Sequence, residues 1–272
     1  MLSAAWTVAE PLKAHLEFLH LRLKLEVAAS RSQQASIGRD PAIRDALGHL
    51  ALEQANVSAS AGNYVRHFCR DHGIALSDKH SGVDSVSADW LEENEADPAR
   101  LLFHARHSDL TVLGRAQHPD CMPANVIEQV LAESGHPLLI VPRRVPRPLL
   151  ETIVVGWKES AASARAIVAA LPLLQLARRV VIVNVVEANS PGLDALYSVS
   201  RQLAWHGVTA EILRLGDSIA TAEELLPATV TDLKAGLLVI GGYGHSRRRE
   251  TVFGGVTRSL VRGADIPLFI VH

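Results

Sequence analysis

The sequence has few of the features that mark secreted, membrane-spanning or nucleic-acid-binding proteins. Its 272 residues contain two cysteines, Cys69 and Cys121, too few for a fold held together by disulfides. The longest apolar runs, such as residues 180–183, fall far short of the roughly 18 continuous apolar residues that a membrane-spanning helix needs. No basic segment precedes an apolar run at the start of the chain, so no signal peptide is predicted. We expect a cytoplasmic protein that does not act at a membrane.

An excess of charge of one sign is also absent, since 27 Lys and Arg residues stand against 29 Asp and Glu residues. This balance argues against nucleic acid as a partner. The phosphate-binding Walker loop, the Gly-x-Gly-x-x-Gly turn, the Gly-x-Ser-x-Gly elbow and the His-Glu-x-x-His zinc motif are all missing. No catalytic residue is therefore assigned. If the protein has any enzymatic activity, we expect it to be slow hydrolysis of a nucleotide.

What the chain does contain is an internal repeat. The segment 142–148 holds three prolines and three arginines and is typical of a linker. Residues 137–141 before it match residues 267–271 at the C-terminus, and the apolar run 110–114 matches 237–241. A period this long indicates duplicated domains. We predict a first domain over 1–142, a linker over 143–150 and a second domain over 151–272.

The second half predicts a complete α/β domain. Apolar runs without alternation are typical of parallel strands buried on both faces. The expected strands are 152–156, 180–186, 209–215, 237–241 and 267–271, and helical spacing fills 160–176, 194–205, 219–233 and the segment from about 256. With right-handed crossovers, this order gives one five-stranded parallel sheet covered by helices on both faces.

The first half predicts an incomplete version of the same domain. It begins in a helix-like stretch, 3–13, which runs into a strand over 16–23, so the counterpart of strand 152–156 has no residues to form it. A four-stranded sheet is expected, with a long helical region reaching His72. The missing strand leaves an exposed edge that must be covered, by the second domain or, as we expect, by a second copy in a homodimer.

The glycine-rich segment after strand 237–241 is the candidate ligand site, because ligands of such sheets bind at the carboxyl ends of the strands. Glycines let backbone N–H groups approach an anion closely, and a following helix presents its positive N-terminus. The candidate binding residues are Gly241, Gly244, Gly254, Gly255, Val256, Thr257 and Arg258. In the alternative interpretation, the glycines serve turns and a tight contact between a helix and a strand.

The spacing of these glycines resembles a known nucleotide-binding signature. Gly241, two residues, Gly244, nine residues and Gly254, followed by Val-Thr-Arg, is similar to the signature of the universal stress protein family. The resemblance covers nearly the whole chain as a tandem member with two such domains. It implies two doubly wound α/β domains of the adenine-nucleotide-hydrolase-like type, ATP or AMP held at the strand ends, and a role in stress survival.

The sequence departs from that family pattern at several positions. The resemblance implies a Ser or Thr where Gly255 stands and an Asp where Lys158 stands. In the first half, residues 115–123 have no second glycine, so we expect a degenerate domain without a nucleotide site. A protein-interaction module without ligand is therefore the alternative function, and any phosphorylated small molecule is an alternative ligand.

Two clusters have the residue types of a zinc site. They are His67, Cys69 and His72 in one segment and His118 and Cys121 in another. Among 13 histidines, chance pairings of this kind are expected. No metal site is predicted.

Overall fold

The computed structural model describes residues 1–22, 41–77, 84–93, 98–115, 124–145, 147–186, 192–216, 221–242, 255–263 and 265–272. The helices are α1 (Leu2–Leu12), α3 (Pro41–Asp71), α4 (Pro98–Arg106), α5 (Ala124–Glu133), α6 (Ala161–Leu176), α7 (Leu193–Trp205), α8 (Ala222–Asp232) and α9 (Gly255–Gly263). The strands are β1 (His15–Leu21), β2 (Ala75–Leu76), β3 (Ser87–Glu93), β4 (Thr111–Gly114), β5 (Leu138–Val141), β6 (Thr152–Gly156), β7 (Arg179–Val185), β8 (Ala210–Leu215), β9 (Leu237–Gly241) and β10 (Leu268–Val271). Among these helices, none is long and apolar enough to cross a membrane.

The five strands of the second half form the sheet that the sequence predicts. Their order is β10-β9-β6-β7-β8, and every neighbouring pair is parallel. The central strands β6 and β9 are buried up to their last residue, which is half-buried, because both faces are covered by helices. The predicted α/β fold with a parallel sheet is confirmed, and the predicted helices and strands of this half lie within a few residues of their expected bounds.

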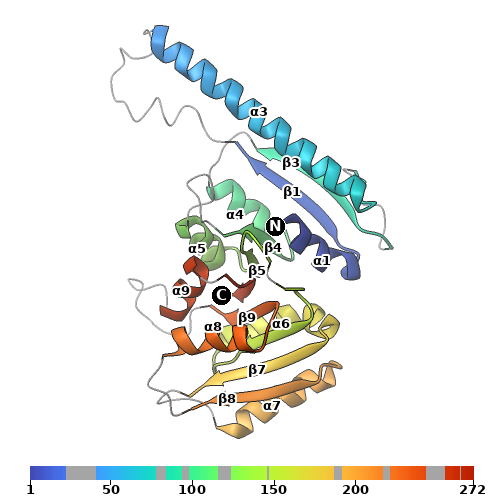
Figure 1. Cartoon of the computed structure of the whole chain (residues 1–272), viewed down its shortest axis with the longest axis vertical. Coiled ribbons are helices and arrows are strands. Elements are labelled where there is room, and N and C mark those ends of the chain that lie inside the picture. The colour runs from blue at the N-terminus through green and yellow to red at the C-terminus, as the bar shows by residue number, and fades with distance from the viewer. Residues whose placement is uncertain are drawn as a thin grey trace. The chain divides into compact units, whose positions relative to one another are not determined.

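The strands β4 and β5 of the first half extend this sheet. β5 pairs antiparallel with β10, so that Leu138 lies opposite Ile270 and Ile140 opposite Leu268. β4 then pairs parallel with β5, and the result is a seven-stranded sheet, β4-β5-β10-β9-β6-β7-β8 (Figure 1). The expectation of a separate four-stranded sheet in the first half was wrong, because the last strands of the two repeats pair with each other.

The other strands of the first half form a small parallel sheet in the order β1-β3-β2. Helix α3 packs along it (Figure 1), where Phe68 meets Phe18 edge to face at 6.4 Å between ring centroids. Among the described strands, β1 pairs with β3 alone and β4 with β5 alone. The described strands of the first half are therefore divided between two sheets.

These sheets define two compact units of the chain. One contains residues 1, 3–8 and 102–272, and the other contains residues 2 and 9–101. The compact units correspond to the two sheets, whereas the predicted domains 1–142 and 151–272, with the linker 143–150, correspond to the sequence repeat. Those repeat boundaries stay a prediction.

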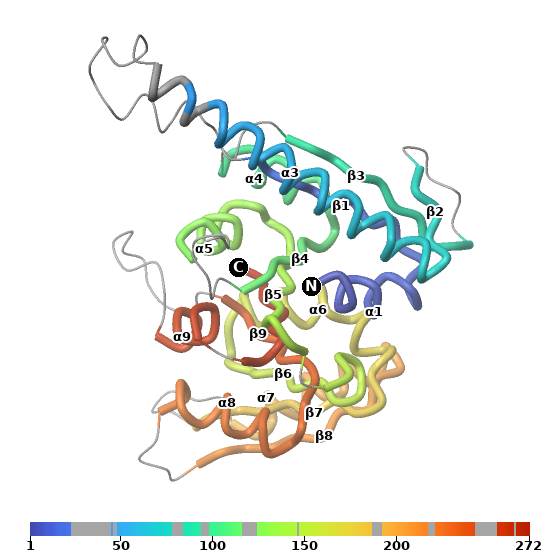
Figure 2. The backbone as a smooth tube through the Cα atoms, turned by 45° about the horizontal axis from the view of Figure 1, so that its top comes forward, coloured from blue at the N-terminus to red at the C-terminus, as the bar shows by residue number. Residues whose placement is uncertain are grey.

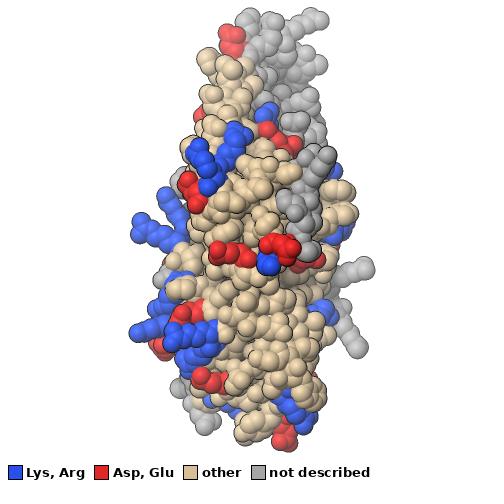
Figure 3. All heavy atoms as spheres, turned by 90° about the vertical axis from the view of Figure 1, so that its right-hand side faces the viewer, with Lys and Arg blue, Asp and Glu red and all other residues tan. Residues whose placement is uncertain are grey.

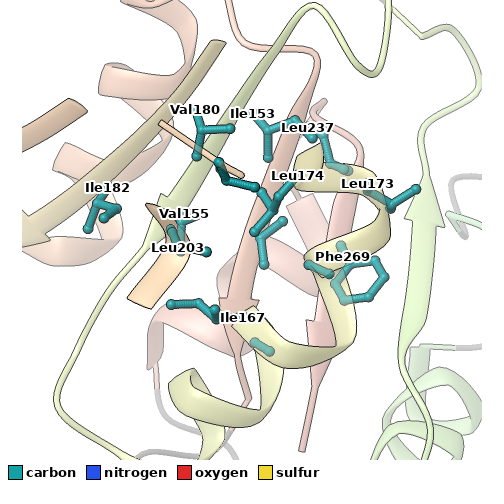
Figure 4. Close-up of a cluster of buried hydrophobic side chains, with 14 of the residues drawn as sticks. Ile153, Val155, Ile167, Leu173, Leu174, Val180, Ile182, Leu203, Leu237 and Phe269 are labelled. Carbon is teal, nitrogen blue, oxygen red and sulfur yellow. The ribbon is translucent and has the colours of Figure 1, made fainter. Parts of the chain in front are cut away.

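The main core lies on the face of the seven-stranded sheet that α6 and α7 cover. Side chains from alternate positions of β6, β7, β9 and β10 meet α6 there, as Figure 4 shows for Ile153, Ile167, Leu174 and Phe269. Ala4 and Val8 of α1 belong to the same cluster. Burying this apolar surface is the main source of stability for the unit.

We expect Phe269→Ala to lower the free energy of unfolding by about 3–5 kcal/mol, because Phe269 is only 1% exposed and its removal leaves a cavity. Urea denaturation of the two proteins measures the difference. Val168→Ala is the control, since Val168 lies on the exposed side of α6. Equal midpoints for the two variants would contradict the assigned core.

Candidate functional site

The strand order makes the carboxyl ends of β6 and β9 the candidate place for a ligand. From β6 the chain proceeds to β7 and β8 on one side, and then returns to β9 and β10 on the other. Neighbouring strands whose connections leave in opposite directions form the crevice where ligands of open α/β sheets bind. Gly156 ends β6 and Gly241 ends β9 at this point.

Gly241 is required by the packing of α6. A Cβ atom at this position would lie 2.4 Å from the carbonyl carbon of Ala162 and 2.4 Å from the nitrogen of Ser163, both backbone atoms of the first turn of the helix. Ser160 caps that turn, since its Oγ accepts a hydrogen bond from the Ser163 N–H at 3.1 Å. The tight helix–strand contact therefore explains Gly241 without a ligand, and it also brings the positive N-terminus of α6 to the crevice.

Two buried polar side chains at the same edge each have one atom without a hydrogen-bond partner among the described residues. Trp157 follows β6 and is 7% exposed, and Asn184 near the end of β7 is 1% exposed. The Asn184 Nδ2 donates to the Trp157 carbonyl oxygen at 3.1 Å. The indole Nε1 of Trp157 and the Oδ1 of Asn184 have no hydrogen-bond partner among the described residues. A buried donor and a buried acceptor left open are costly unless a ligand or water completes them.

Apart from Gly241, the candidate binding residues that the structure describes all lie in helix α9. Because α9 connects the parallel strands β9 and β10, its N-terminus lies at the carboxyl edge of the sheet. Gly255 is its first residue, Val256 is half-buried, Thr257 is buried and Arg258 is exposed. Gly244 and Gly254 lie outside the described residues, so their predicted role stays a prediction.

An acidic side chain that the sequence reasoning missed lies at this N-terminus. Helices α8 and α9 are neighbours (Figures 1 and 2), and a Cβ atom at Gly255 would lie 1.6 Å from Oε1 of Glu223, in the first turn of α8. The space that a Ser or Thr side chain would need is thus filled by a carboxylate. The one sequence signal was the adjacent pair Glu223 and Glu224, which reads as an ordinary acidic start of a helix.

A cation stands on the loop that enters α6. Lys158 is half-buried between Trp157 and the capping Ser160. The resemblance implied an Asp at this place, so the crevice has a positive group where the family pattern has an acceptor. Lys158 and Glu223 carry opposite charges.

In the first half, an arginine follows the strand that corresponds to β9. The Arg115 N–H donates to the Val141 carbonyl at 2.8 Å, just as the Gly242 N–H donates to the Val271 carbonyl at 2.6 Å. The Arg115 side chain is 4% exposed, and its Nη2 donates to the Ile266 carbonyl at 3.2 Å. Burial lowers the pKa of Arg115 to about 10, and the charge of Asp265 opposes this shift. Residues 116–123 lie outside the described part, so the expected lack of a cradle here stays a prediction.

The histidine and cysteine clusters form no metal site in the part of the chain that the structure describes, which holds no group of three potential ligands. Cys69 is buried, and burial raises the pKa of its thiol. His72 Nδ1 lies 2.9 Å from the Phe68 carbonyl oxygen. His118 and Cys121 lie outside the described residues.

The fold is that of known stress proteins. A universal stress protein from Archaeoglobus fulgidus DSM 4304 superposes with a TM-score of 0.68 at 15% identity, over 98% of this chain and 91% of that one. A functionally unknown protein from Pseudomonas aeruginosa PAO1 superposes with a TM-score of 0.57 at 13% identity, over 99% and 86%. No protein-family model and no curated protein matches the sequence. The resemblance seen in the sequence is confirmed at the level of the fold.

We expect Gly241→Ala to force the first turn of α6 away from β9, because the new methyl group would overlap backbone atoms that have no freedom to rotate aside. The cost is about 3 kcal/mol of unfolding free energy. Thermal denaturation measures it against Gly263→Ala, where an added Cβ meets nothing within 4 Å. A melting temperature of Gly241→Ala equal to that of the control would remove this contact from the description of the site.

Proposed function

We propose that this protein is a stress-response protein that binds an adenine nucleotide, ATP or AMP, at the carboxyl ends of β6 and β9. The observation that carries the proposal is the topological crevice at Gly156 and Gly241, with the N-termini of α6 and α9 at the same edge. Backbone N–H groups at a helix N-terminus favour negative groups such as phosphates. Arg258, exposed in the first turn of α9, supplies a positive charge.

Two buried polar atoms lie at the same edge of the sheet. Trp157 Nε1 can donate a hydrogen bond, and Asn184 Oδ1 can accept one. Both atoms are closed off from solvent in this structure, so a nucleotide would contact them only after the edge of the sheet opens around them.

Binding rather than turnover is the proposed role. Efficient phosphoryl transfer needs a positioned nucleophile and metal, and the sequence carries none of the common motifs for either. The protein would act in the cytoplasm as a homodimer. Acidic and basic side chains are interspersed on the face drawn in Figure 3.

A protein-interaction module without ligand is the second candidate, and one surface favours it. Leu193, Tyr197 and Trp205 are spaced at multiples of four along α7 and are all exposed, Trp205 to 76%. Arg201, at the same spacing, lies over the Trp205 ring at 5.7 Å from its centroid. Exposed aromatic and arginine side chains of this kind are enriched at protein interfaces.

We expect the purified chain to bind one molecule of ATP or AMP, and Arg258→Gln to weaken that binding about tenfold, since a charge-assisted hydrogen bond to phosphate is worth about 1.5 kcal/mol or more. Isothermal titration calorimetry measures the affinity. Arg214→Gln, on exposed strand β8, makes the same change of net charge away from the crevice and is the control.

Absence of binding at millimolar ATP and AMP would overturn the nucleotide proposal and favour the interaction module. Equal weakening in Arg258→Gln and Arg214→Gln would retain nucleotide binding but remove Arg258 from the site. Steady phosphate release that persists in both variants would mark background hydrolysis from another source.

A further inference from the structure

Helix α7 carries an exposed row of large side chains at one edge of the larger unit. The helix packs against β8, the edge strand of the seven-stranded sheet (Figure 1). Leu193, Tyr197 and Trp205 are 46%, 60% and 76% exposed, and Arg201 between them is exposed as well. We call these four residues the α7 row. Each follows the one before it by four positions, so together they form a single ridge on the helix surface.

The α7 row is separate from the face by which α7 is held on its own sheet. Leu196, Val199 and Leu203 form that inner face, and each is at most 6% exposed. A helix at a protein surface ordinarily has a polar outer side, whereas the outer side of α7 is largely aromatic and aliphatic. The α7 row therefore has the composition of a surface that binds another protein.

The α7 row is complementary to a second copy of itself in the antiparallel direction. Its members lie symmetrically about position 199, so a two-fold axis there places Leu193 opposite the partner's Trp205 and Tyr197 opposite the partner's Arg201. Each contact then occurs twice, as in any interface with two-fold symmetry. The apolar side chains meet each other, and each guanidinium meets an aromatic ring.

Charge and helix packing favour the same direction. Asp194 and Arg201 are the two charged residues of α7. Antiparallel pairing brings the acidic first turn of one helix toward the basic part of the other, whereas parallel pairing brings like charges together. Ridges of residues four apart interlock at a crossing angle of about −50°, which is the commonest packing of two helices.

The area of the α7 row is sufficient for a weak, reversible dimer. In two copies, the exposed parts of Trp205 and Tyr197 amount to on the order of 600 Å². Leu193 and the aliphatic stem of Arg201 bring the covered area close to the roughly 1,000 Å² from which specific interfaces begin.

We propose that two copies of this chain dimerise through the α7 row, with their α7 helices antiparallel. This inference rests on the homodimer of the proposed function and names its interface. From the sequence, the second copy was expected at an unpaired strand edge of the first half, and the α7 row places it on the second half instead.

The first test measures the dimer by sedimentation velocity over a range of micromolar concentrations. Tyr197→Ala and Trp205→Ala should each weaken the dimer about thirtyfold, because a central aromatic side chain is lost twice. Tyr64→Ala is the matched control, since Tyr64 is 67% exposed on α3, and it should dimerise as the unchanged chain does. All three side chains are exposed, so thermal unfolding should confirm that the variants keep their fold.

The second test determines the direction of the two helices. In the antiparallel arrangement, Tyr197→Glu faces the partner's Arg201 and gains an ion pair, whereas Tyr197→Lys faces it with a like charge. The dimer of Tyr197→Glu should therefore be about tenfold tighter than that of Tyr197→Lys. Equal affinities would overturn the antiparallel arrangement, because in parallel pairing position 197 meets itself and both substitutions repel.

The remaining outcomes separate this inference from the proposed function. A dimer that is unchanged in Tyr197→Ala and Trp205→Ala would retain the homodimer but overturn the α7 row as its interface. Equal weakening in Tyr64→Ala would do the same. A chain that stays monomeric at every concentration would overturn both the α7 interface and the homodimer, while nucleotide binding is decided independently by the calorimetric titration.

Discussion

The antiparallel pairing of β5 with β10 is the contact on which the larger unit depends. Three residue pairs, from Leu138 and Ile270 to Ile140 and Leu268, join the last strands of the two repeats into one sheet. Both strands are fully buried, so this pairing hides two sheet edges at once. It also brings α5 to α9, where Arg262 Nε donates to the largely buried Glu128 at 3.0 Å. Helix α9, which carries part of the candidate site, is thereby held in place by residues of the first half of the chain.

The site itself depends on how closely two helices approach the strand ends. Gly241 allows the first turn of α6 to rest on β9, and Gly255 allows Glu223 to reach the start of α9. Gly241 belongs to the signature, and its contact with the backbone of α6 explains it without a ligand. Gly255 stands where the signature has a Ser or Thr, and there the neighbouring atom is the movable end of the exposed Glu223 side chain. The open Trp157 Nε1 and Asn184 Oδ1 are not explained in that way. They remain the polar groups of this edge that most need a partner.

The sequence was a good guide to the second half and a poorer one to the first. Strands such as 152–156 and 237–241 are apolar throughout, and the physics of burial on both faces leaves them few alternatives. In the first half, the strand patterns predicted one four-stranded sheet, whereas the described strands belong to two sheets. A hydrophobic pattern predicts where the strands are but not which strands pair with each other. The pairing of β5 with β10 could therefore not be deduced from the sequence. The candidate site stays a prediction: spacing proposed Gly241, Thr257 and Arg258, whereas Glu223, Trp157 and Asn184 entered the description only with the structure.

The sequence by itself determined the class of fold, because hydrophobic periodicity is a local property that can be recognised without knowing the partner of a segment. It also predicted, from the glycine spacing, the edge of the sheet where a ligand would bind. Only the tertiary structure decided which polar groups meet there. Glu223 lies 32 residues before Gly255 and on another helix, and Asn184 reaches the Trp157 carbonyl from another strand. Contacts of this kind depend on helix packing and strand order, which are set by the burial of the whole core and not by any segment of the chain.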